Sequence, residues 1–239
     1  MEGLILVIET SGDGGGAALL RGGNVLAESL VSAPRRHGAE LMQCIENCLN
    51  TAKVSRDQLD VIAVNAGPGS YTGLRIGLST ASGIGHALDR PVVGVGSLDA
   101  MALQYVGAPG FNVALKRELW PVLDARQGEV MTARFETAGG QFRRVSGDML
   151  VKPSALHEQS QHAGIVFGSG VALYTEQFDR ANLFIDSKPF ALMPSSVGLQ
   201  AHLQLYEVYD RADIPRAAVE ARYFRRVTAK TLAERAKAS

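Results

Sequence analysis

The segment at residues 66–77, which reads AGPGSYTGLRIG, constrains the fold of this chain more than any other part of the sequence. It joins an apolar run at 61–65 to a helix that we expect over 72–88. A glycine-rich turn between a strand and a helix presents backbone N–H groups, which is typical of phosphate-binding loops. In the helix, small residues recur every four positions on one face: Gly73, Gly77, Ala81 and Gly85. Glycine costs about 1 kcal/mol relative to alanine inside a helix, so this face predicts close packing against another backbone.

Charge and hydropathy exclude several classes of protein. The 239 residues include 24 basic and 24 acidic side chains, so no global positive field attracts nucleic acid. No apolar run approaches the roughly 18 residues of a membrane span, and the first residues lack the basic region of a signal peptide. We therefore expect a cytoplasmic protein without a membrane partner. Cys44 and Cys48 lie four apart on a predicted helix, where a disulfide or, more simply, two buried thiols would fit.

The first half of the chain has the element order of a ribonuclease-H-like unit. Three apolar runs form a predicted meander, and two helix–strand pairs follow, whose strands become parallel through right-handed crossovers. The expected strands are 4–9, 16–20, 25–31, 61–65 and 92–95, and the expected helices are 36–52, 72–88 and 98–105.

A second, smaller α/β unit is expected after a break at Ala108-Pro109-Gly110. Its expected strands are 119–123, 129–136, 164–168 and 183–186, followed by a helix over 196–209. We therefore predict an α/β protein of the actin, Hsp70 and sugar-kinase (ASKHA) class, with two ribonuclease-H-like subdomains of which the second is reduced. In that superfamily, ATP binds between the two copies. The predicted divisions are 1–107, 108–218 and a closing segment with a basic tail, 219–239.

The basic tail supports two interpretations. Its last 18 residues, 222–239, contain one acidic residue, Glu234, beside the basic residues Arg222, Arg225, Arg226, Lys230, Arg235 and Lys237. Such a run is most simply a solvated segment, and the alternative is contact with RNA or a protein partner.

Two loops are candidates for phosphate binding. The first is Glu9-Thr10-Ser11, directly after the first strand, and the second includes Gly67, Gly69 and Ser70. No lysine accompanies either loop, and only Asp13 adds a carboxylate beside Glu9, so both loops are equally explained as tight turns. We expect at most a vestigial phosphate site here.

Neither a metal site nor a nucleophile is indicated. The five histidines, at 37, 86, 157, 162 and 202, show no metal-ligand spacing. The Gly-x-Ser-x-Gly motif is absent, and Ser70 has no base that the sequence identifies. We predict no catalytic residue and no cofactor belonging to this chain alone.

The helix expected over 36–52 has apolar residues on more than one face. Leu41, Ile45 and Leu49 form one row, whereas Ala39 and Met42 lie off it. The helix is therefore either sandwiched inside one domain or packed with its outer side against another protein.

These residues together resemble the TsaB (YeaZ) family, a bacterial component of the machinery that makes threonylcarbamoyladenosine in tRNA. The resemblance covers nearly the whole chain and is most specific at 67–77. It also includes 4–11, His37, the Asp-Ala-Arg segment at 123–130 and the closing element at 219–225. The chain departs from the family at two positions. Glu9 stands where the family usually has Asp, and its longer side chain would move any magnesium-bound water. Ala221 stands where the family often has Pro.

The resemblance implies a pseudo-enzyme that acts through partners. In the paralogous catalytic subunit, TsaD, two histidines after the matching strand bind a metal, and Ser97 and Met101 occupy those positions here. The implied partners are a TsaD-type catalytic subunit, a TsaE-type ATPase and, through their complex, tRNA; a homodimer is expected when TsaD is absent. ATP or ADP is expected at the interface of the complex. The predicted interface consists of His37, Leu41, Ile45, Gly73, Gly77, Ala81 and Gly85.

Two other functions remain open on the sequence. An independent nucleotide-binding protein or ATPase of the same superfamily would use the two loops directly. A metallopeptidase, an old label for relatives of this family, would need metal ligands that the sequence does not provide.

Overall fold

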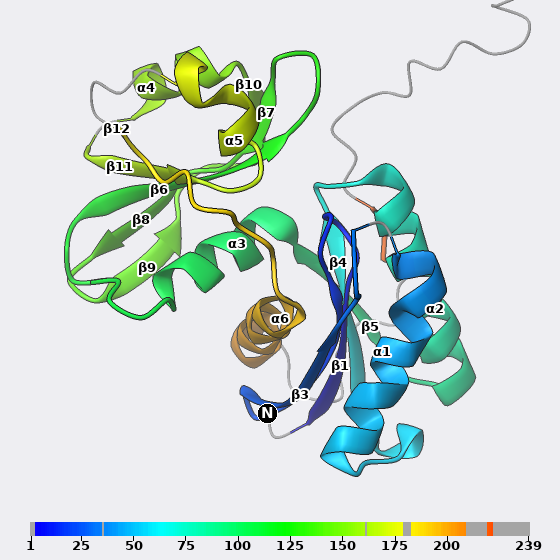
Figure 1. Cartoon of the computed structure of the whole chain (residues 1–239). Helices are drawn as coiled ribbons and strands as arrows, with labels where there is room; N and C mark the ends of the chain where they lie inside the picture. The colour runs from blue at the N-terminus through cyan, green and yellow to red at the C-terminus, as the bar shows by residue number, and fades with distance from the viewer. Residues whose placement is uncertain (1–2, 35, 161, 179–182, 209–218, 222–239) are drawn as a thin grey trace, which may run out of the picture.

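The computed structural model shows two lobes, each built around a β-sheet, with helices α3 and α6 between them (Figure 1). It describes residues 3–34, 36–160, 162–178, 183–208 and 219–221. The basic residues predicted to form the tail, and the last residue of the helix predicted at 196–209, lie outside the described residues. Among the described helices, none is long and apolar enough to cross a membrane.

The first sheet has five strands in the order β3-β2-β1-β4-β5. Strands β1 (Leu4–Glu9), β2 (Gly16–Arg21) and β3 (Asn24–Leu30) form the antiparallel meander. Strands β4 (Val61–Gly67) and β5 (Val92–Gly96) continue the sheet in parallel. All five predicted strands of this half are confirmed, with ends that differ by at most two residues.

Helices cover both faces of this sheet. Helices α1 (His37–Ala52) and α2 (Tyr71–Leu88) lie on one face, while α3 (Ser97–Val106) and α6 (Pro194–Val208) lie on the other (Figure 1). Strands β1, β2 and β4 are accordingly buried on both sides, as their continuous apolar runs require, whereas the edge strand β3 is mostly exposed. Along β1, Leu4, Leu6 and Ile8 join the core under α1, whereas Ile5 and Val7 join the core under α6.

The second sheet is built on three parallel strands extended by short antiparallel ones. The parallel strands are β6 (Arg117–Asp124), β11 (Gly164–Phe167) and β12 (Leu183–Ile185). The antiparallel strands are β7 (Val130–Thr132), β8 (Phe135–Ala138), β9 (Gln141–Arg144) and β10 (Met149–Val151). The remaining short elements are α4 (Leu156–Gln159), α5 (Val171–Tyr174) and the 3₁₀ turns η1 (Arg56–Gln58), η2 (Pro153–Ala155) and η3 (Thr175–Gln177).

The structure differs from the predicted second unit in two ways. The single strand expected at 129–136 is split into β7 and β8, and β9 and β10 were not predicted. Helix α6, expected to pack in the second unit, instead packs on the first sheet against β1 and β2, because Val197, Ala201 and Leu205 supply an apolar row. The chain therefore returns to the first lobe, and the limits at 107 and 218 stay a prediction.

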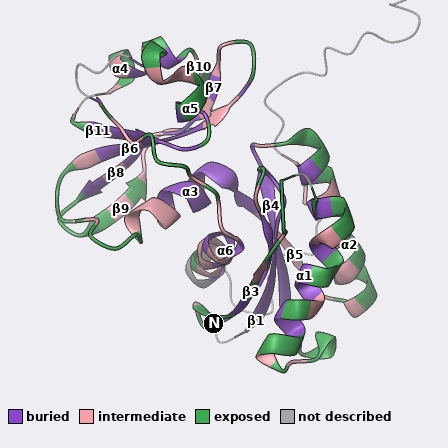
Figure 2. Cartoon of the chain, in the orientation of Figure 1, coloured by how far each residue is buried: buried purple, intermediate pink, exposed green. Residues whose placement is uncertain are grey.

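The architecture confirms the predicted fold class. The first sheet has the ribonuclease-H-like order, and the second repeats only its parallel centre, in which the short strands β11 and β12 follow β6. Buried residues are concentrated in the central strands of the two sheets and in the first half of α3, the helix that leads from one lobe to the other (Figure 2). Cys44 and Cys48 are buried free thiols rather than a disulfide.

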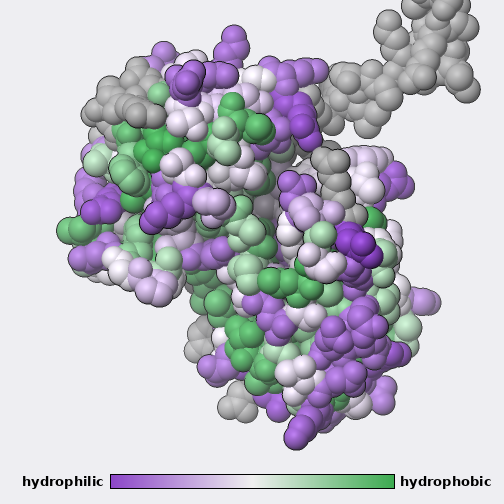
Figure 3. Space-filling view, in the orientation of Figure 1, coloured by the Kyte–Doolittle hydropathy of each residue, from purple (hydrophilic) through white to green (hydrophobic). Residues whose placement is uncertain are grey.

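Apolar side chains also remain on the surface of the first lobe. On the face shown in Figure 3 they gather over β3 and α6, where Val25, Leu26, Leu30 and Leu203 are exposed. Met42 on α1 is also exposed and belongs to the site described below.

Candidate functional site

The carboxyl ends of β1 and β4 carry a closed polar network. Glu9 is fully buried, and its Oε1 accepts hydrogen bonds from the Ser11 backbone N–H (2.5 Å) and hydroxyl (2.7 Å). The amide of Asn65 donates to Glu9 Oε2 and to Ser11 Oγ. Asn65 Oδ1 in turn accepts from the Gly67 N–H and the Ser97 hydroxyl, both at 2.8 Å. Both carboxylate oxygens of Glu9 are therefore used inside the chain.

Burial dominates the electrostatics of Glu9. It raises the pKa of the carboxyl above its ordinary value of 4.5, and the hydrogen bonds from Ser11 and Asn65 offset only part of that effect. A carboxyl in this environment favours its neutral form more than one in water. Both features disfavour Glu9 as a ligand for a hydrated magnesium ion, which needs an accessible carboxylate.

The two predicted phosphate loops pack on each other. The Ser70 N–H donates to the Ser11 carbonyl at 2.7 Å, and the Thr10 hydroxyl donates to the Gly73 carbonyl at 2.8 Å. A Cβ on Gly69 would lie 2.4 Å from the Ser11 carbonyl oxygen, which explains why glycine is required there.

Three of the amides that could cradle a phosphate are already used within the chain. The N–H groups of Gly67, Ser70 and Gly73 donate to Asn65, Ser11 and the Ser70 hydroxyl respectively. Pro68 has no N–H to offer. The geometry of both loops is that of tight turns, which was the second of the two explanations that the sequence allowed. A vestigial phosphate site in these loops stays a prediction.

The four predicted small residues of α2 face the chain's own sheet. We call Gly73, Gly77, Ala81 and Gly85 the buried row, since all four are buried. A Cβ on Gly73 would lie 1.9 Å from the Thr10 carbonyl oxygen, and one on Gly77 would lie 2.3 Å from Thr10 Oγ1. A Cβ on Gly85 would lie 2.5 Å from Val92 Cγ2.

The buried row thus corrects the predicted interface. The spacing of the row predicts close packing against another backbone, and this packing is present. The backbone belongs to the region of β1, β4 and β5 in the same chain and not to a partner. The same correction applies to His37, Leu41 and Ile45 on α1, which are all buried. Leu41 and Ile45 belong to the core, and His37 Nε2 lies 3.0 Å from the Gly12 carbonyl.

A different set of residues forms the outer surface of α1 and α2. On α2, Ser79, Gly83 and Ala87 are also four apart and are exposed; we call them the exposed row. A Cβ on Gly83 would meet nothing within 4 Å. On α1, Ala39 and Met42 are exposed, Met42 by 53%. The sequence pattern indicated this outer side through Ala39 and Met42. The exposed row was missed because small polar and apolar residues resemble ordinary surface.

An apolar groove runs between the two helices beside the exposed row. It has a volume of about 130 Å³ and its walls include Met42, Leu49, Ile84, Ala87 and Leu88. Glu46 and Arg56 stand at the groove as well, and they are bonded to each other. The surface can therefore accept apolar side chains at its centre while remaining polar at its edge.

Ser97 and Met101, which the family resemblance matches to the metal ligands of the catalytic paralogue, have structural surroundings in this chain. Ser97 is buried and donates to Asn65, while Met101 is buried in the core between α3 and the second sheet. Across the described part of the chain, no cluster of three or more His, Cys, Asp or Glu side chains could hold a metal ion.

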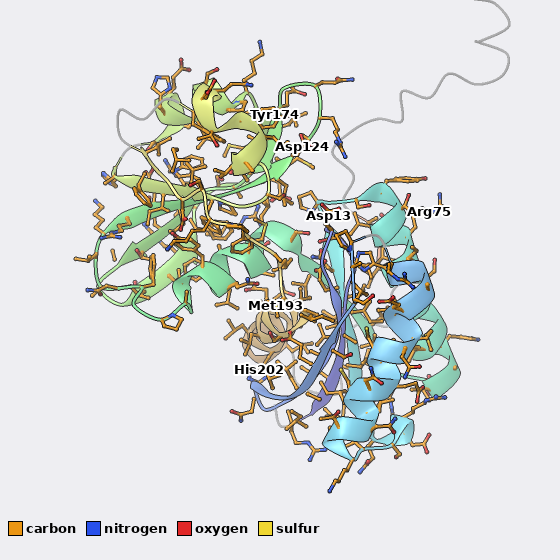
Figure 4. The ribbon with its side chains drawn as sticks, viewed as in Figure 1. Asp13, Arg75, Asp124, Tyr174, Met193 and His202 are labelled. Atoms are coloured by element: carbon orange, nitrogen blue, oxygen red, sulfur yellow. The ribbon has the colours of Figure 1, made fainter. Side chains whose placement is uncertain are left out.

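The second lobe presents Asp124 at the end of β6, on the side that faces Asp13 of the first lobe (Figure 4). The Tyr174 hydroxyl and the Arg126 N–H both donate to Asp124 Oδ1 at 2.8 Å. The hydrogen bond to Asp124 raises the pKa of Tyr174. These bonds fix the turn at 126–128, whose residues all have positive φ, so Asp124 has a local structural role.

The comparisons with known proteins agree with the fold and with the sequence motifs. The family model described as "TsaD: tRNA N6-adenosine threonylcarbamoyltransferase" matches residues 28–234. The tRNA threonylcarbamoyladenosine biosynthesis protein TsaB of Bacillus subtilis is 34% identical over 147 residues, which cover 62% of this chain and 61% of that protein. TsaB of Escherichia coli is 32% identical over 66% of each chain. The match therefore spans about three fifths of the first relative's length.

A solved structure shares the whole architecture. YeaZ from Pseudomonas aeruginosa superposes with a TM-score of 0.77 over 93% of this chain and 100% of its own, at 22% sequence identity. At that identity the likeness supports the fold alone. The extent of the family match and the TsaB relatives lead to one conclusion: this chain belongs to the TsaB (YeaZ) family, within the group that the TsaD model describes.

Proposed function

We propose that this chain is a non-catalytic scaffold that activates a TsaD-type catalytic subunit in the synthesis of threonylcarbamoyladenosine in tRNA. The complex transfers a threonylcarbamoyl group to the adenosine beside the anticodon, and a TsaE-type ATPase assists it. The chain would act in the cytoplasm, where it would contact tRNA through the complex. It would hold the catalytic subunit in a competent shape and contribute no nucleophile.

The observation that carries this proposal is the outer surface of α1 and α2. Its exposed row lets a partner backbone approach closely, and the adjoining apolar groove accepts side chains. Met42, 53% exposed at the centre of this surface, is suited to adaptable contacts because its side chain is unbranched and flexible. A second copy of the chain would cover the same surface when the catalytic subunit is absent.

The loops support the non-catalytic part of the proposal. Glu9 is buried with both oxygens bonded, and several amides of the glycine loop are used within the chain. An independent ATPase would need these groups to face its nucleotide. ATP or ADP would instead bind where the partner completes a site.

The experiment is reconstitution of the transfer reaction from this chain, the TsaD-type and TsaE-type proteins of the same organism, tRNA, ATP and the threonylcarbamoyl precursor. Met42→Glu places a charge in the centre of the proposed interface and should lower the transfer rate at least about tenfold. Leu173→Glu, at a residue 60% exposed on the second lobe, is the matched control and should leave the rate unchanged.

Two results would contradict the proposal. One is an unchanged transfer rate with Met42→Glu. The other is ATP turnover by this chain alone that Thr10→Ala abolishes, which would favour the independent ATPase.

A further inference from the structure

Two described connections cross between the lobes. Helix α3 leads from the first lobe to the second, and residues 186–193 return from β12 to α6 (Figure 1). We call residues 186–193 the strap; they form neither helix nor strand. An irregular segment of this kind can change its span when the bodies that it joins move, because its backbone dihedral angles are free to adjust. What holds the strap therefore decides whether the lobes can move.

The strap is attached to the second lobe at its start and to the first lobe at its end. The Asp186 N–H donates to the Val166 carbonyl on β11 at 2.8 Å. The ring of Phe190 lies 5.4 Å from the ring of Phe167, measured between centroids. Leu192 packs against the cores of both lobes. The strap then enters α6, which packs on the first sheet.

Gln104 on α3 binds the end of the strap that enters the first lobe. Its Nε2 donates to the Ala191 carbonyl at 2.8 Å, and its Oε1 accepts from the Met193 N–H at 2.9 Å. Met193 lies where the strap meets α6 (Figure 4). A Cβ on Gly14 would lie 3.6 Å from the Ala191 Cβ, so this part of the strap also contacts the first predicted phosphate loop.

Tyr105, the next residue of α3, binds the other end of the strap. Its hydroxyl donates to Asp186 Oδ2 at 2.8 Å, and its ring stacks on Phe167 with 4.0 Å between centroids. Burial and the hydrogen bond to Asp186 raise the pKa of Tyr105, so the hydroxyl stays protonated and can donate.

Both ends of the strap are thus bound by successive residues of one helix. A helix is a rigid element, so two ends fixed to it leave the strap a single span. We propose that Gln104 and Tyr105 form a latch that holds the two lobes in one relative orientation. Release of the strap from the latch lets the lobes change that orientation. The proposal goes beyond the scaffold function and does not depend on it.

The test measures the distance between the lobes in the full chain by pulsed electron paramagnetic resonance. Spin labels are attached at Asn50→Cys on α1 and Leu173→Cys on α5, which are both exposed positions. The native thiols of Cys44 and Cys48 are buried, so the label reacts at the introduced ones. The chain with its latch intact should give one narrow distance distribution.

Two variants release the strap. Gln104→Met removes both hydrogen bonds to the strap and keeps an unbranched side chain that suits a helix. The single narrow distance should be lost, and the Met193 N–H should exchange with solvent about tenfold faster. Tyr105→Phe removes only the hydroxyl and should broaden the distribution less. Gln200→Met makes the first substitution at a half-buried position of α6 and should change neither measurement.

Three results would overturn the proposal. One is a broad distance distribution in the chain with an intact latch. Another is an unchanged narrow distance in Gln104→Met or in Tyr105→Phe, even if the Met193 N–H exchanges faster, because the strap would then loosen without moving the lobes. The third is the same broadening in Gln200→Met. Tyr105→Phe keeps the test decisive if Gln104→Met fails to fold.

Discussion

Helix α2 carries two rows of small residues with the same spacing and opposite surroundings. At the three glycines of the buried row, an added Cβ would lie too close to atoms in or beside the chain's own sheet. The fourth member, Ala81, packs in the core. In the exposed row, a Cβ on Gly83 would meet nothing within 4 Å. The difference teaches that small residues four apart indicate close packing, but not which backbone provides it.

The comparison extends to the loops at the start of the helix. The groups that open the buried row are tied to β1: the Thr10 hydroxyl donates to Gly73, and Ser70 donates to Ser11. The surface beside the exposed row has an apolar groove instead. One side of α2 therefore builds the lobe, and the other is left for a partner.

The largest effect is expected from Gly77→Leu in the buried row. Its Cβ would lie 2.3 Å from Thr10 Oγ1 and 3.4 Å from Val64 Cγ2, both in a packed core. Overpacking of this kind should lower the free energy of unfolding by about 3 kcal/mol or more. Urea unfolding followed by circular dichroism measures it, and an unchanged stability would show that α2 does not pack on the sheet as described.

Gly83→Ala is the control for that substitution in the exposed row. It adds a Cβ into open space and replaces glycine in a helix, so it should raise the free energy of unfolding by up to about 1 kcal/mol. The two variants should therefore move the stability in opposite directions.

A smaller and pH-dependent effect is expected at Glu9, which belongs to the network under the buried row. Because burial raises its pKa in the folded state, its contribution to stability is present below the ordinary pKa of 4.5 and is lost as the pH rises through the raised value. Glu9→Gln has no such loss, so its stability should improve relative to the unmodified chain as the pH rises from 4.5.

A pKa that is higher by one in the folded than in the unfolded state changes the free energy of unfolding by about 1.4 kcal/mol. This value sets the size of the pH-dependent difference between the two proteins. Urea unfolding of both proteins between pH 4.5 and 8 would show it. Parallel pH profiles would mean that Glu9 ionises in the fold as it does in water.

Much of the fold could be predicted from the sequence, because apolar runs and turn residues are local signals. The five strands of the first sheet and helices α1, α2 and α3 were all found in this way. The position of α6 was not, since its apolar row fits either lobe and the sequence order suggested the second. Strands β9 and β10 are short and half-exposed, so their periodicity is weak.

The candidate site was predicted only in outline. Helical spacing identified which residues share a face, as Gly73 and Gly77 do, but it does not reveal what covers that face. Only the packing on Thr10 and Val92 showed that the sheet does so.

The most direct test of this account measures complex formation by Gly83→Leu and the TsaD-type subunit, using light scattering after size exclusion. We expect this variant to fold, because the new side chain points into open space, and to lose the complex that the unmodified chain forms. A stable complex with Gly83→Leu, at the affinity of the unmodified chain, would contradict the assignment of this face of α2 to the partner.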